Sequence, residues 1–236
     1  MRILIAAQPK SGNVWARNIL ANIYDLIDLN IHVDNVPRHA AEFSEFVEAG
    51  LFLDDSVLHQ HFNPKPEVLA ACEALDCHVV TLLRNPYDAF VSFYFYVNRH
   101  KRRFQGTASG QLIDKPMDHP DVVRFLGHTY RRHLLIARRW MESGRASVLR
   151  YEDLHATPLA SVRAVTERIE PVSDSQIEKA LKACSASQLR KQGGWLKAHI
   201  RVAGTGDWEK HLQPVHLEQF RSKYATLIQS LGYDVL

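Results

Sequence analysis

Cysteine is scarce in this sequence of 236 residues. The three cysteines, Cys72, Cys77 and Cys184, form no C-x-x-C pair, and an odd number of thiols in a chain of this length does not describe a disulfide framework. Metal-ligand clusters are also lacking, because His59 and His61 supply two imidazoles without the third and fourth ligands of a zinc site. We therefore expect a metal-free protein of a reducing compartment, the cytoplasm.

Long apolar runs are absent as well. No stretch of about 18 consecutive apolar residues occurs, so the sequence predicts no transmembrane helix. The first apolar run, Ile3 to Ala7, is shorter than the roughly 7–15 residues of a signal-peptide core and is stopped by Pro9 and Lys10. We expect neither an export signal nor a membrane partner.

Charge of one sign does not dominate the chain either. The 29 Lys and Arg against 26 Asp and Glu leave a net charge of +3, too small and too scattered to predict a nucleic-acid partner. Any anionic ligand must therefore be bound by a local site. Hydrophobic residues make up 46% of the chain and charged residues 23%, as in ordinary globular proteins, and the length favours one domain over residues 1–236.

Strand and helix patterns alternate along the chain, which predicts an α/β domain with a central parallel sheet flanked by helices. Short buried-strand patterns occur at Ile3–Ala7, Ser56–His59, Cys77–Leu83 and Ala146–Tyr151. Stretches with the helical period occur at Asn13–Leu29, Pro66–Leu75, Pro86–Tyr96, Asp121–Glu142 and Pro214–Leu231. Two irregular stretches, 98–120 and 192–207, interrupt this pattern, and the first is a candidate mobile loop.

The loop after the first predicted strand runs from Gln8 to Trp15 with the sequence Q-P-K-S-G-N-V-W. It leads into a helix whose N-terminus presents unpaired backbone N–H groups, and Lys10 adds a positive charge. This pattern favours a phosphate or sulfate ligand, although an ordinary strand-to-helix turn with a solvated Lys10 shares it. Lys10 precedes Gly12, the only glycine of the loop, so the Walker motif is absent and a nucleoside triphosphatase is disfavoured.

A second loop, R-N-P-Y-D, begins with Arg84 at the end of a predicted parallel strand. Open α/β sheets bind ligands at this edge, and Ser92 follows about two helical turns into the next helix. Arg84 and Ser92 are therefore placed to bind one phosphate. The alternative is an ion pair between Arg84 and Asp88, with Ser92 facing solvent.

Together the two loops resemble the sulfotransferases that use 3′-phosphoadenosine 5′-phosphosulfate (PAPS). In that family a P-K-S-G-[ST]-[ST]-W loop holds the 5′-phosphosulfate, and R-N-P-x-D with a following serine holds the 3′-phosphate. A third family signature, R-K-G-x-x-G-D-W, resembles the segment from Arg201 to Trp208, and Tyr151 matches the tyrosine on the adenine side. The four signatures follow in the family's order over residues 8–208.

The resemblance implies the P-loop-like nucleotide-binding architecture of sulfotransferases, with PAPS as donor, 3′-phosphoadenosine 5′-phosphate (PAP) as product and no metal. It assigns the first loop to the phosphosulfate, Arg84, Ser92 and Arg201 to the 3′-phosphate, and aromatic rings to the adenine. The implied donor-binding residues are Lys10, Ser11, Gly12, Asn13, Val14, Trp15, Arg84, Ser92, Tyr151, Arg201, Val202 and Ala203.

Four residues depart from the family's signatures. Asn13 and Val14 replace the usual pair of hydroxyl residues, so Val14 offers only its backbone N–H to a phosphate. Val202 and Ala203 replace Lys-Gly, which removes one positive charge and adds a Cβ where the backbone usually approaches the 3′-phosphate. These departures predict weaker PAPS binding than is usual in the family.

The family removes the acceptor's proton with a base, commonly the histidine of a K-x-H stretch after a strand. The stretch S-V-L-H-Q-H-F is similar, with His61 at the base position and His59 where a lysine is frequent. An imidazole suits this task because its unperturbed pKa is about 6.5. The resemblance implies in-line sulfuryl transfer in which His61 deprotonates the acceptor, Lys10 stabilises the leaving oxygen and Ser92 restrains Lys10 until the acceptor binds.

A basic run, R-H-K-R-R from Arg99 to Arg103, opens the first irregular stretch. It is either a solvated face or, together with Tyr94, Phe95 and Tyr96, part of an acceptor pocket that favours an anionic or large acceptor.

The sequence therefore predicts a PAPS-dependent sulfotransferase that modifies a hydroxyl group, or less favourably an amine, of a small or medium molecule. The alternatives are a catalytically impaired nucleotide-binding protein of the same fold and a P-loop-type kinase. The chain length resembles the soluble bacterial-type members of the family, and a homodimer is left open.

Overall fold

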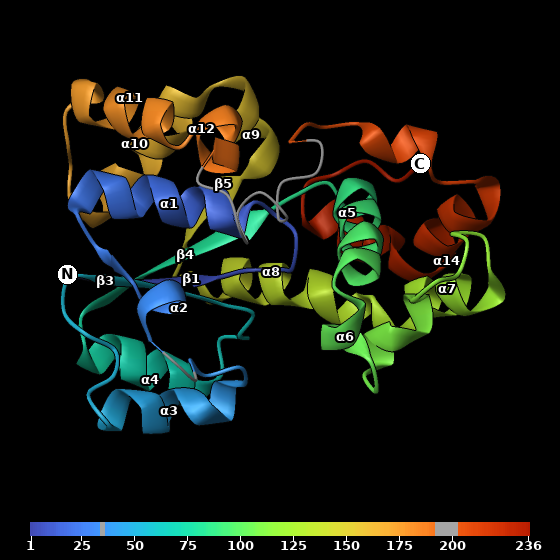
Figure 1. Cartoon of the computed structure of the whole chain (residues 1–236), viewed down its shortest axis with the longest axis horizontal. Helices are drawn as coiled ribbons and strands as arrows, with labels where there is room; N and C mark the ends of the chain where they lie inside the picture. Colours follow the sequence, from blue (N-terminus) through green and yellow to red (C-terminus); the bar gives the residue numbers. More distant parts are fainter. Residues whose placement is uncertain (34–35, 192–202) are drawn as a thin grey trace.

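The computed structural model describes residues 1–33, 36–191 and 203–236. Within them the centre of the molecule is a parallel sheet with the strand order β2-β3-β1-β4-β5 (Figure 1). The strands are β1 (Arg2–Ala6), β2 (Ile27–Asp28), β3 (Ser56–Gln60), β4 (Cys77–Leu83) and β5 (Ser147–Arg150). The predicted α/β class with a central parallel sheet is confirmed.

Helices cover both faces of the sheet, which explains the uninterrupted apolar sequence of β1. Ile3 and Ile5 belong to the buried cluster on one face, and Leu4 and Ala6 belong to the cluster on the other face. The first face carries α1 (Asn13–Tyr24), α10 (Pro158–Ile169) and α11 (Asp174–Ala183), drawn above the sheet in Figure 1. The second carries α3 (Ala40–Glu48), α4 (Pro66–Ala74) and part of α8 (Arg131–Ser143). The short helices α2 (Leu29–His32), α9 (Tyr151–Ala156) and α12 (Ala186–Lys191) lie between these elements in the chain.

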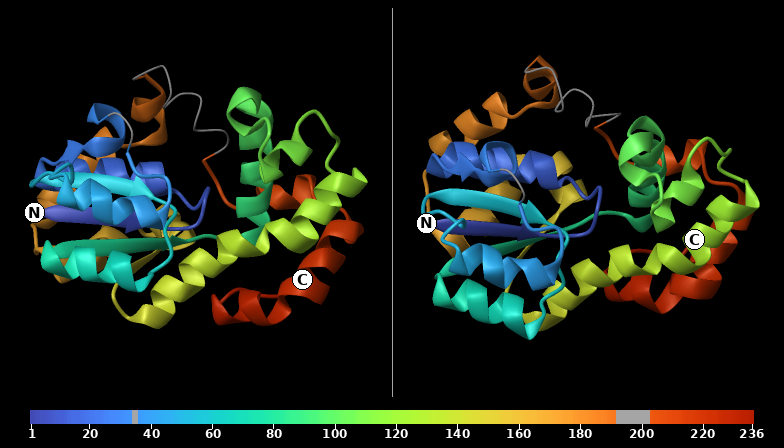
Figure 2. Two further views of the ribbon diagram at one scale, coloured as in Figure 1. Left: turned by 90° about the horizontal axis from the view of Figure 1, so that it is seen from below. Right: turned by 60° about the horizontal axis from the view of Figure 1, so that its bottom comes forward.

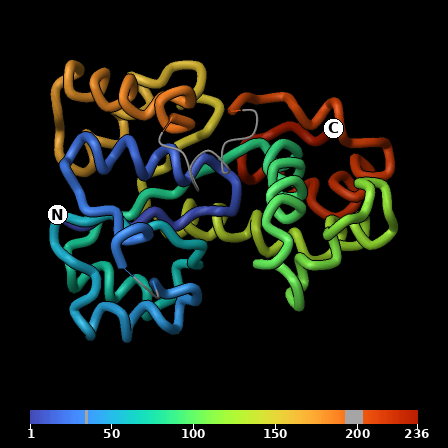
Figure 3. Tube along the Cα trace, viewed as in Figure 1, coloured from blue at the N-terminus to red at the C-terminus, as the bar shows by residue number. Residues whose placement is uncertain are grey.

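A further group of helices lies beyond the carboxyl ends of the strands, on the right in Figures 2 and 3. It contains α5 (Pro86–Arg99), α6 (Lys101–Phe104), the 3₁₀ helices η1 (Ala108–Leu112) and η3 (Asp207–Lys210), α7 (Pro120–Arg124) and α14 (Pro214–Ser230). These helices share a third buried cluster that includes Tyr87, Phe90 and Phe220. Helix α8 joins this group to the sheet, because Leu134 packs in the third cluster while Trp140 packs under the sheet.

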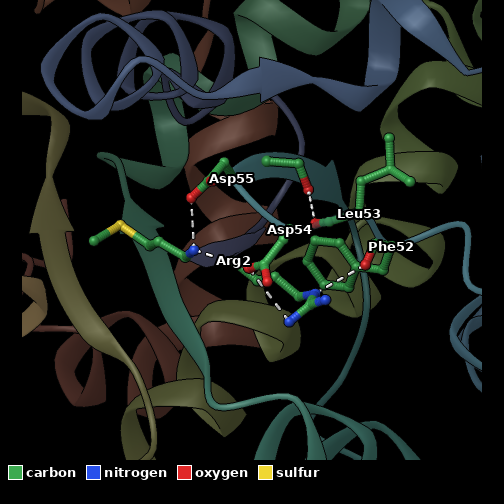
Figure 4. A network of polar contacts seen from close by, with 7 residues as sticks. Arg2, Phe52, Leu53, Asp54 and Asp55 are labelled. Carbon is green, nitrogen blue, oxygen red and sulfur yellow. Dashed lines mark hydrogen bonds and ion pairs between the residues drawn. The ribbon is translucent and has the colours of Figure 1, made fainter.

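A polar network holds the start of β3 beside the start of β1 (Figure 4). Arg2 Nε donates a hydrogen bond to the Phe52 carbonyl at 2.9 Å, and Arg2 Nη1 lies 3.5 Å from Asp54 Oδ1. The Ser56 hydroxyl donates to the Leu53 carbonyl at 2.6 Å. Arg2 then pairs with Ser56 in a register that brings the carboxyl ends of β1 and β3 side by side.

The predicted helix Asn13–Leu29 is wrong beyond Tyr24. Asp25 adopts a left-handed conformation with φ of 53° and donates its backbone N–H to the Ala21 carbonyl, which ends α1. Aspartate tolerates this conformation better than most residues. The following Ile27 continues the apolar period but pairs with Ser56 as strand β2.

Three other predicted elements need correction. The stretch 98–120 is not wholly irregular, because it contains α6 and η1. The predicted helix Asp121–Glu142 is divided into α7, a π-helical turn η2 (Phe125–Thr129) and α8. Tyr151 is the first residue of α9 rather than the last residue of a strand. Of the predicted irregular stretch 192–207, residues 192–202 lie outside the described residues.

Candidate active site

The site lies where β1 and β3 diverge. These neighbouring strands lead into helices on opposite faces of the sheet, α1 and α4, and such a switch point opens a crevice at the carboxyl edge (Figure 1). A cavity of about 1500 Å³ occupies this position. The predicted site residues that line it are Lys10, Gly12, Asn13, Val14, Trp15, His61, Arg84, Ser92, Tyr151 and Ala203. Ser11 is buried behind this wall, while Arg201 and Val202 lie outside the described residues.

Internal hydrogen bonds shape the first loop. The Ser11 hydroxyl lies 2.9 Å from the Gln8 carbonyl and 2.8 Å from Asn13 Oδ1, and Asn13 Nδ2 donates to the same Gln8 carbonyl at 3.0 Å. The first-turn amides of α1, at Asn13, Val14 and Trp15, have no intrahelical acceptor because no helical turn precedes them, and no side chain of the N-cap residue bonds to them. The side chains of Ser11 and Asn13 close the loop, and its backbone amides are left to bind an anion.

Gly12 has to be a glycine for two reasons. Its φ of 97° is unfavourable for residues with a side chain, and a Cβ at this position would lie 2.7 Å from Tyr151 Cδ2. The loop therefore packs directly against the Tyr151 ring. Trp15 meets the same ring edge-on at 6.1 Å between centroids. The Trp15 Nε1–H is buried and has no hydrogen-bond partner among the described residues, which marks a place for a polar atom of a ligand.

Arg84 ties three segments together. It donates to the Lys10 carbonyl at 3.1 Å and to the Gly204 carbonyl at 3.0 Å, and its guanidinium carbon lies 4.2 Å from the centre of the Tyr151 ring. Its Nε–H is buried without a hydrogen-bond partner among the described residues. Arg84 thus joins the first and second loops to the segment that begins at Ala203.

Asp88 belongs to the second signature, and the alternative interpretation of that loop paired it with Arg84. The structure gives Asp88 a different role. Its carboxylate accepts hydrogen bonds from the Gly206 N–H at 2.7 Å and the Trp208 N–H at 3.0 Å. Through Asp88, the R-N-P-Y-D loop therefore holds the third signature segment in place. Ala203, in the third signature, adopts a φ of 59°, a conformation in which glycine is favoured.

The structure also shows how the second loop is held. Asn85 accepts hydrogen bonds through its side chain from the backbone of α5, and its own N–H donates to Glu152 Oε1 at 2.8 Å. Glu152 Oε2 accepts a further hydrogen bond from the Tyr233 hydroxyl at 2.9 Å. Sequence reasoning missed Glu152, and its position directly after Tyr151 was the available signal.

His61 lines the crevice and is exposed to it. Its Nδ1 is 2.7 Å from the Ala7 carbonyl. Because a carbonyl only accepts, Nδ1 carries the proton of the neutral ring and Nε2 is left as the acceptor. Desolvation, with smaller contributions from the charges of Arg103 and Lys10, lowers the pKa of His61 to about 4. The ring is therefore neutral near pH 7 and able to take a proton.

Lys10 lies close to helix α5. Its Nζ is 4.2 Å from the centre of the Tyr96 ring, one helical turn beyond Ser92, which lines the same cavity. Lys10 itself has a φ of 67°. Lys10 and Ser92 therefore both line this cavity, and Tyr96 is a direct contact of the lysine.

Another histidine on the cavity wall, His133, was not foreseen. His133 of α8 is 6% exposed, and its ring lies 4.6 Å from the Phe93 ring. Its Nδ1 has no hydrogen-bond partner among the described residues. Desolvation lowers the pKa of His133 to about 3, with smaller contributions from Arg132 and His61.

None of the helices in the described residues combines the length and the apolar character needed to cross a membrane. The same residues contain no group of three or more His, Cys, Asp or Glu side chains arranged to hold a metal ion.

Comparison with known proteins identifies the family of this chain. The family model for the sulfotransferase domain matches residues 1–232. Sulfotransferase 1E1 of Homo sapiens is 24% identical over 94% of this chain and 82% of its own length. Cytosolic sulfotransferase 16 of Arabidopsis thaliana is 24% identical over 89% of this chain and 71% of its own length.

Solved structures share the fold. The crystal structure of mouse sulfotransferase SULT7A1 complexed with PAP superposes with a TM-score of 0.71 at 16% identity, over 97% of this chain and 84% of that one. Retinol dehydratase, solved with androsterone and the inactive cofactor PAP, gives a TM-score of 0.65 at 14% identity, over 100% of this chain and 82% of that one. The match of the family model over nearly the whole chain confirms the resemblance seen in the loops, and this protein belongs to the sulfotransferase domain family.

Proposed function

We propose that this sulfotransferase transfers a sulfuryl group from PAPS to a hydroxyl group of a small or medium acceptor, with His61 as the general base. The observation that carries the proposal is the meeting of Lys10 and His61 at one crevice, between the loop after β1 and the loop after β3. Membership of the family supplies the donor class. The PAP complexes of mouse SULT7A1 and retinol dehydratase support it further.

The residues present fit such a donor. The first-turn amides of α1 and Lys10 suit the 5′-phosphosulfate, and Arg84 and Ser92 suit the 3′-phosphate, with Arg201 as a further predicted ligand. The unpartnered N–H groups of Trp15 and Arg84 need acceptors of the kind a nucleotide supplies.

His61, Lys10 and Ser92 each have a defined task in the proposed reaction. His61 Nε2 takes the proton of the acceptor hydroxyl as that oxygen attacks the sulfur. The bond from sulfur to the bridging oxygen breaks, and Lys10 stabilises the negative charge that develops on this oxygen. Ser92 restrains Lys10 before the acceptor binds. The attack is in line, so no covalent bond to the protein forms.

Two of the four departures from the family signatures, Asn13 and Ala203, do not favour the alternative of an impaired protein. Asn13, which replaces a hydroxyl residue, closes the first loop with its hydrogen bond to Gln8. Ala203 keeps the backbone conformation for which a glycine is suited, with φ of 59°. A P-loop-type kinase is disfavoured because Lys10 precedes the loop glycine. Bacterial-type membership, cytoplasmic location and a homodimer stay predictions.

Thermal unfolding with PAP, compared with ATP and Mg²⁺, tests the donor site. A ligand at 100 times its Kd adds about 2.7 kcal/mol of stability, which raises Tm by roughly 5–10 °C for a chain of this size. We expect this rise with PAP. A rise with ATP and Mg²⁺ alone would refute the proposal, and no rise with either would favour the impaired protein.

Turnover tests the catalytic assignment. We expect His61→Ala to lower kcat by about 10²–10⁴-fold, while His59→Ala, two positions earlier and within β3, keeps most of the activity. PAP should bind the His61→Ala variant as it binds the wild type. Because the pKa of His61 is lowered to about 4, the acid limb of kcat/KM should fall near pH 4 rather than near the ordinary pKa of about 6.5. Wild-type turnover in His61→Ala would remove this residue from the base role.

A further inference from the structure

The cavity holds more positive charge than the donor requires. Lys10 and Arg84 are used by the donor in the proposed function, and Arg17 is paired with Asp28 at 2.8 Å. Three further arginines line the cavity: Arg38, Arg103 and Arg132. Among the described lining residues the one acidic side chain is Asp207, which lies on the segment bound to Asp88 and is itself 3.3 Å from His211.

Arg103 of α6 and Arg132 of α8 are exposed, and in the described structure they lack ion pairs of the kind that Arg124 of α7 and Arg138 of α8 make. Arg124 and Arg138 each lie within 3.2 Å of a carboxylate. Over residues 1–33, 36–191 and 203–236, no carboxylate lies within 4.0 Å of the guanidinium of Arg103 or Arg132. Arg103 Nη1 instead donates to the Tyr96 hydroxyl at 3.1 Å, which fixes the guanidinium beside the ring that Lys10 contacts.

The histidines of this region show the same excess of positive charge. Besides desolvation, the pKa of His61 is lowered by Arg103 and Lys10, and the pKa of His133 by Arg132 and His61. The pKa of His100 is likewise lowered by Lys10, Arg103 and Arg99. No acidic group offsets these effects on the three histidines. This half of the cavity is therefore a region of positive potential without a counter-charge in the described part of the chain.

Apolar side chains line the same cavity. Phe93 and Phe104 line the cavity from the α5 and α6 side, and Ile136 lines it from α8. Their rings and side chains suit an apolar body, either aromatic or aliphatic. The cavity volume of about 1500 Å³ exceeds the roughly 300–1,000 Å³ usual for a single small ligand, so it has room for a second molecule beside a nucleotide.

We propose that the acceptor is an organic anion, whose hydroxyl lies at His61, whose apolar body packs on Phe93 and Phe104, and whose carboxylate, sulfate or phosphate group binds Arg103 and Arg132. This inference rests on the proposed function and adds the acceptor class to it. The guanidinium fork binds each of these oxyanions through two parallel hydrogen bonds. The acceptor class differs from the uncharged ligands with which retinol dehydratase was solved, androsterone and retinol.

Fluorescence titration of the PAP-saturated protein tests the charge preference. The probes are the anion 8-anilinonaphthalene-1-sulfonate and its uncharged parent N-phenyl-1-naphthylamine. We expect Arg103→Gln and Arg132→Gln each to weaken binding of the anion about tenfold, equal to about 1.4 kcal/mol, and to leave the uncharged probe within twofold of wild type. The matched control is Arg102→Gln, which is on the same helix as Arg103 and exposed like it but absent from the cavity wall.

Equal effects on both probes, or an anion affinity that neither substitution changes relative to Arg102→Gln, would overturn the inference. Competition with phenylacetate, phenyl sulfate and phenyl phosphate then identifies the preferred oxyanion, and benzyl alcohol is the uncharged comparison. Displacement by benzyl alcohol as strong as by the best anion also counts against the proposal. The Tm of the same samples with and without PAP reports whether PAP binds. Probe titrations without PAP measure the effect of the two arginine substitutions on probe affinity even if PAP does not bind. A failure of the proposed donor is thereby separated from a failure of the anionic acceptor.

Discussion

Replacing Asp88 by asparagine should loosen the third signature segment from helix α5. The Asp88 carboxylate is 2% exposed and accepts the N–H groups of Gly206 and Trp208 through its two oxygens. Asparagine is nearly the same size but keeps one of these acceptors, and its amide nitrogen would face a backbone N–H. Hydrogen bonds to charged groups contribute roughly 1.5–3 kcal/mol each, so we expect a loss of about 2 kcal/mol.

For a chain of this length a loss of about 2 kcal/mol corresponds to a fall in Tm of roughly 4–8 °C. Circular dichroism at constant pH measures this shift, and Asp118→Asn is the control because Asp118 is exposed and forms no hydrogen bond or ion pair in the described structure. PAP affinity measured by calorimetry should also fall, since the Gly204 carbonyl of the same segment accepts a hydrogen bond from Arg84. A Tm within about 2 °C of the control and unchanged PAP affinity would refute this account of Asp88.

Two further predictions concern stability. Gly12→Ala places a Cβ 2.7 Å from the Tyr151 ring at a φ of 97°, and we expect a loss of about 2–4 kcal/mol from strain and overpacking. Gly50→Ala, at a φ of 68° with no atom within 4 Å of its Cβ, should lose less, and chemical unfolding curves that coincide for the two variants would contradict the packing argument. The pKa of His133 in the folded protein, about 3, lies below its unfolded value of about 6.5, so the folded state binds fewer protons and loses stability as pH falls between these values. His133→Leu should flatten this part of the Tm profile, and parallel profiles would argue against the lowered pKa.

Local sequence patterns were sufficient for the fold class and for most of the donor loops. The continuous apolar runs of β1 and β4 predict buried parallel strands because helices cover both faces of the sheet. The loops Gln8–Trp15 and Arg84–Asp88 predict ligand binding because a strand end followed directly by a helix N-terminus creates the same amide arrangement in any such sheet. These features depend on neighbours in the sequence, so periodicity and spacing identify them.

Periodicity failed where a single residue or a distant contact changed the local structure. The apolar period continues through Ile27, but the left-handed Asp25 ends α1 and Ile27 joins a strand instead. The apolar period of 121–142 likewise does not reveal the π-helical turn at Phe125–Thr129. In both cases the alternative backbone is compatible with the same pattern of apolar residues, and tertiary packing selects between them.

The sequence by itself determined the family, the order of the signatures and the types of residue available for chemistry at the crevice. Only the tertiary structure decided that Asp88 holds Gly206 and Trp208 rather than pairing with Arg84. It also decided that Ala7 orients His61, and that Arg103 faces the cavity while Arg102 does not. The physical reason is that hydrogen-bond partners, desolvation and local potential arise from groups far apart in the chain, which no spacing within the sequence brings together.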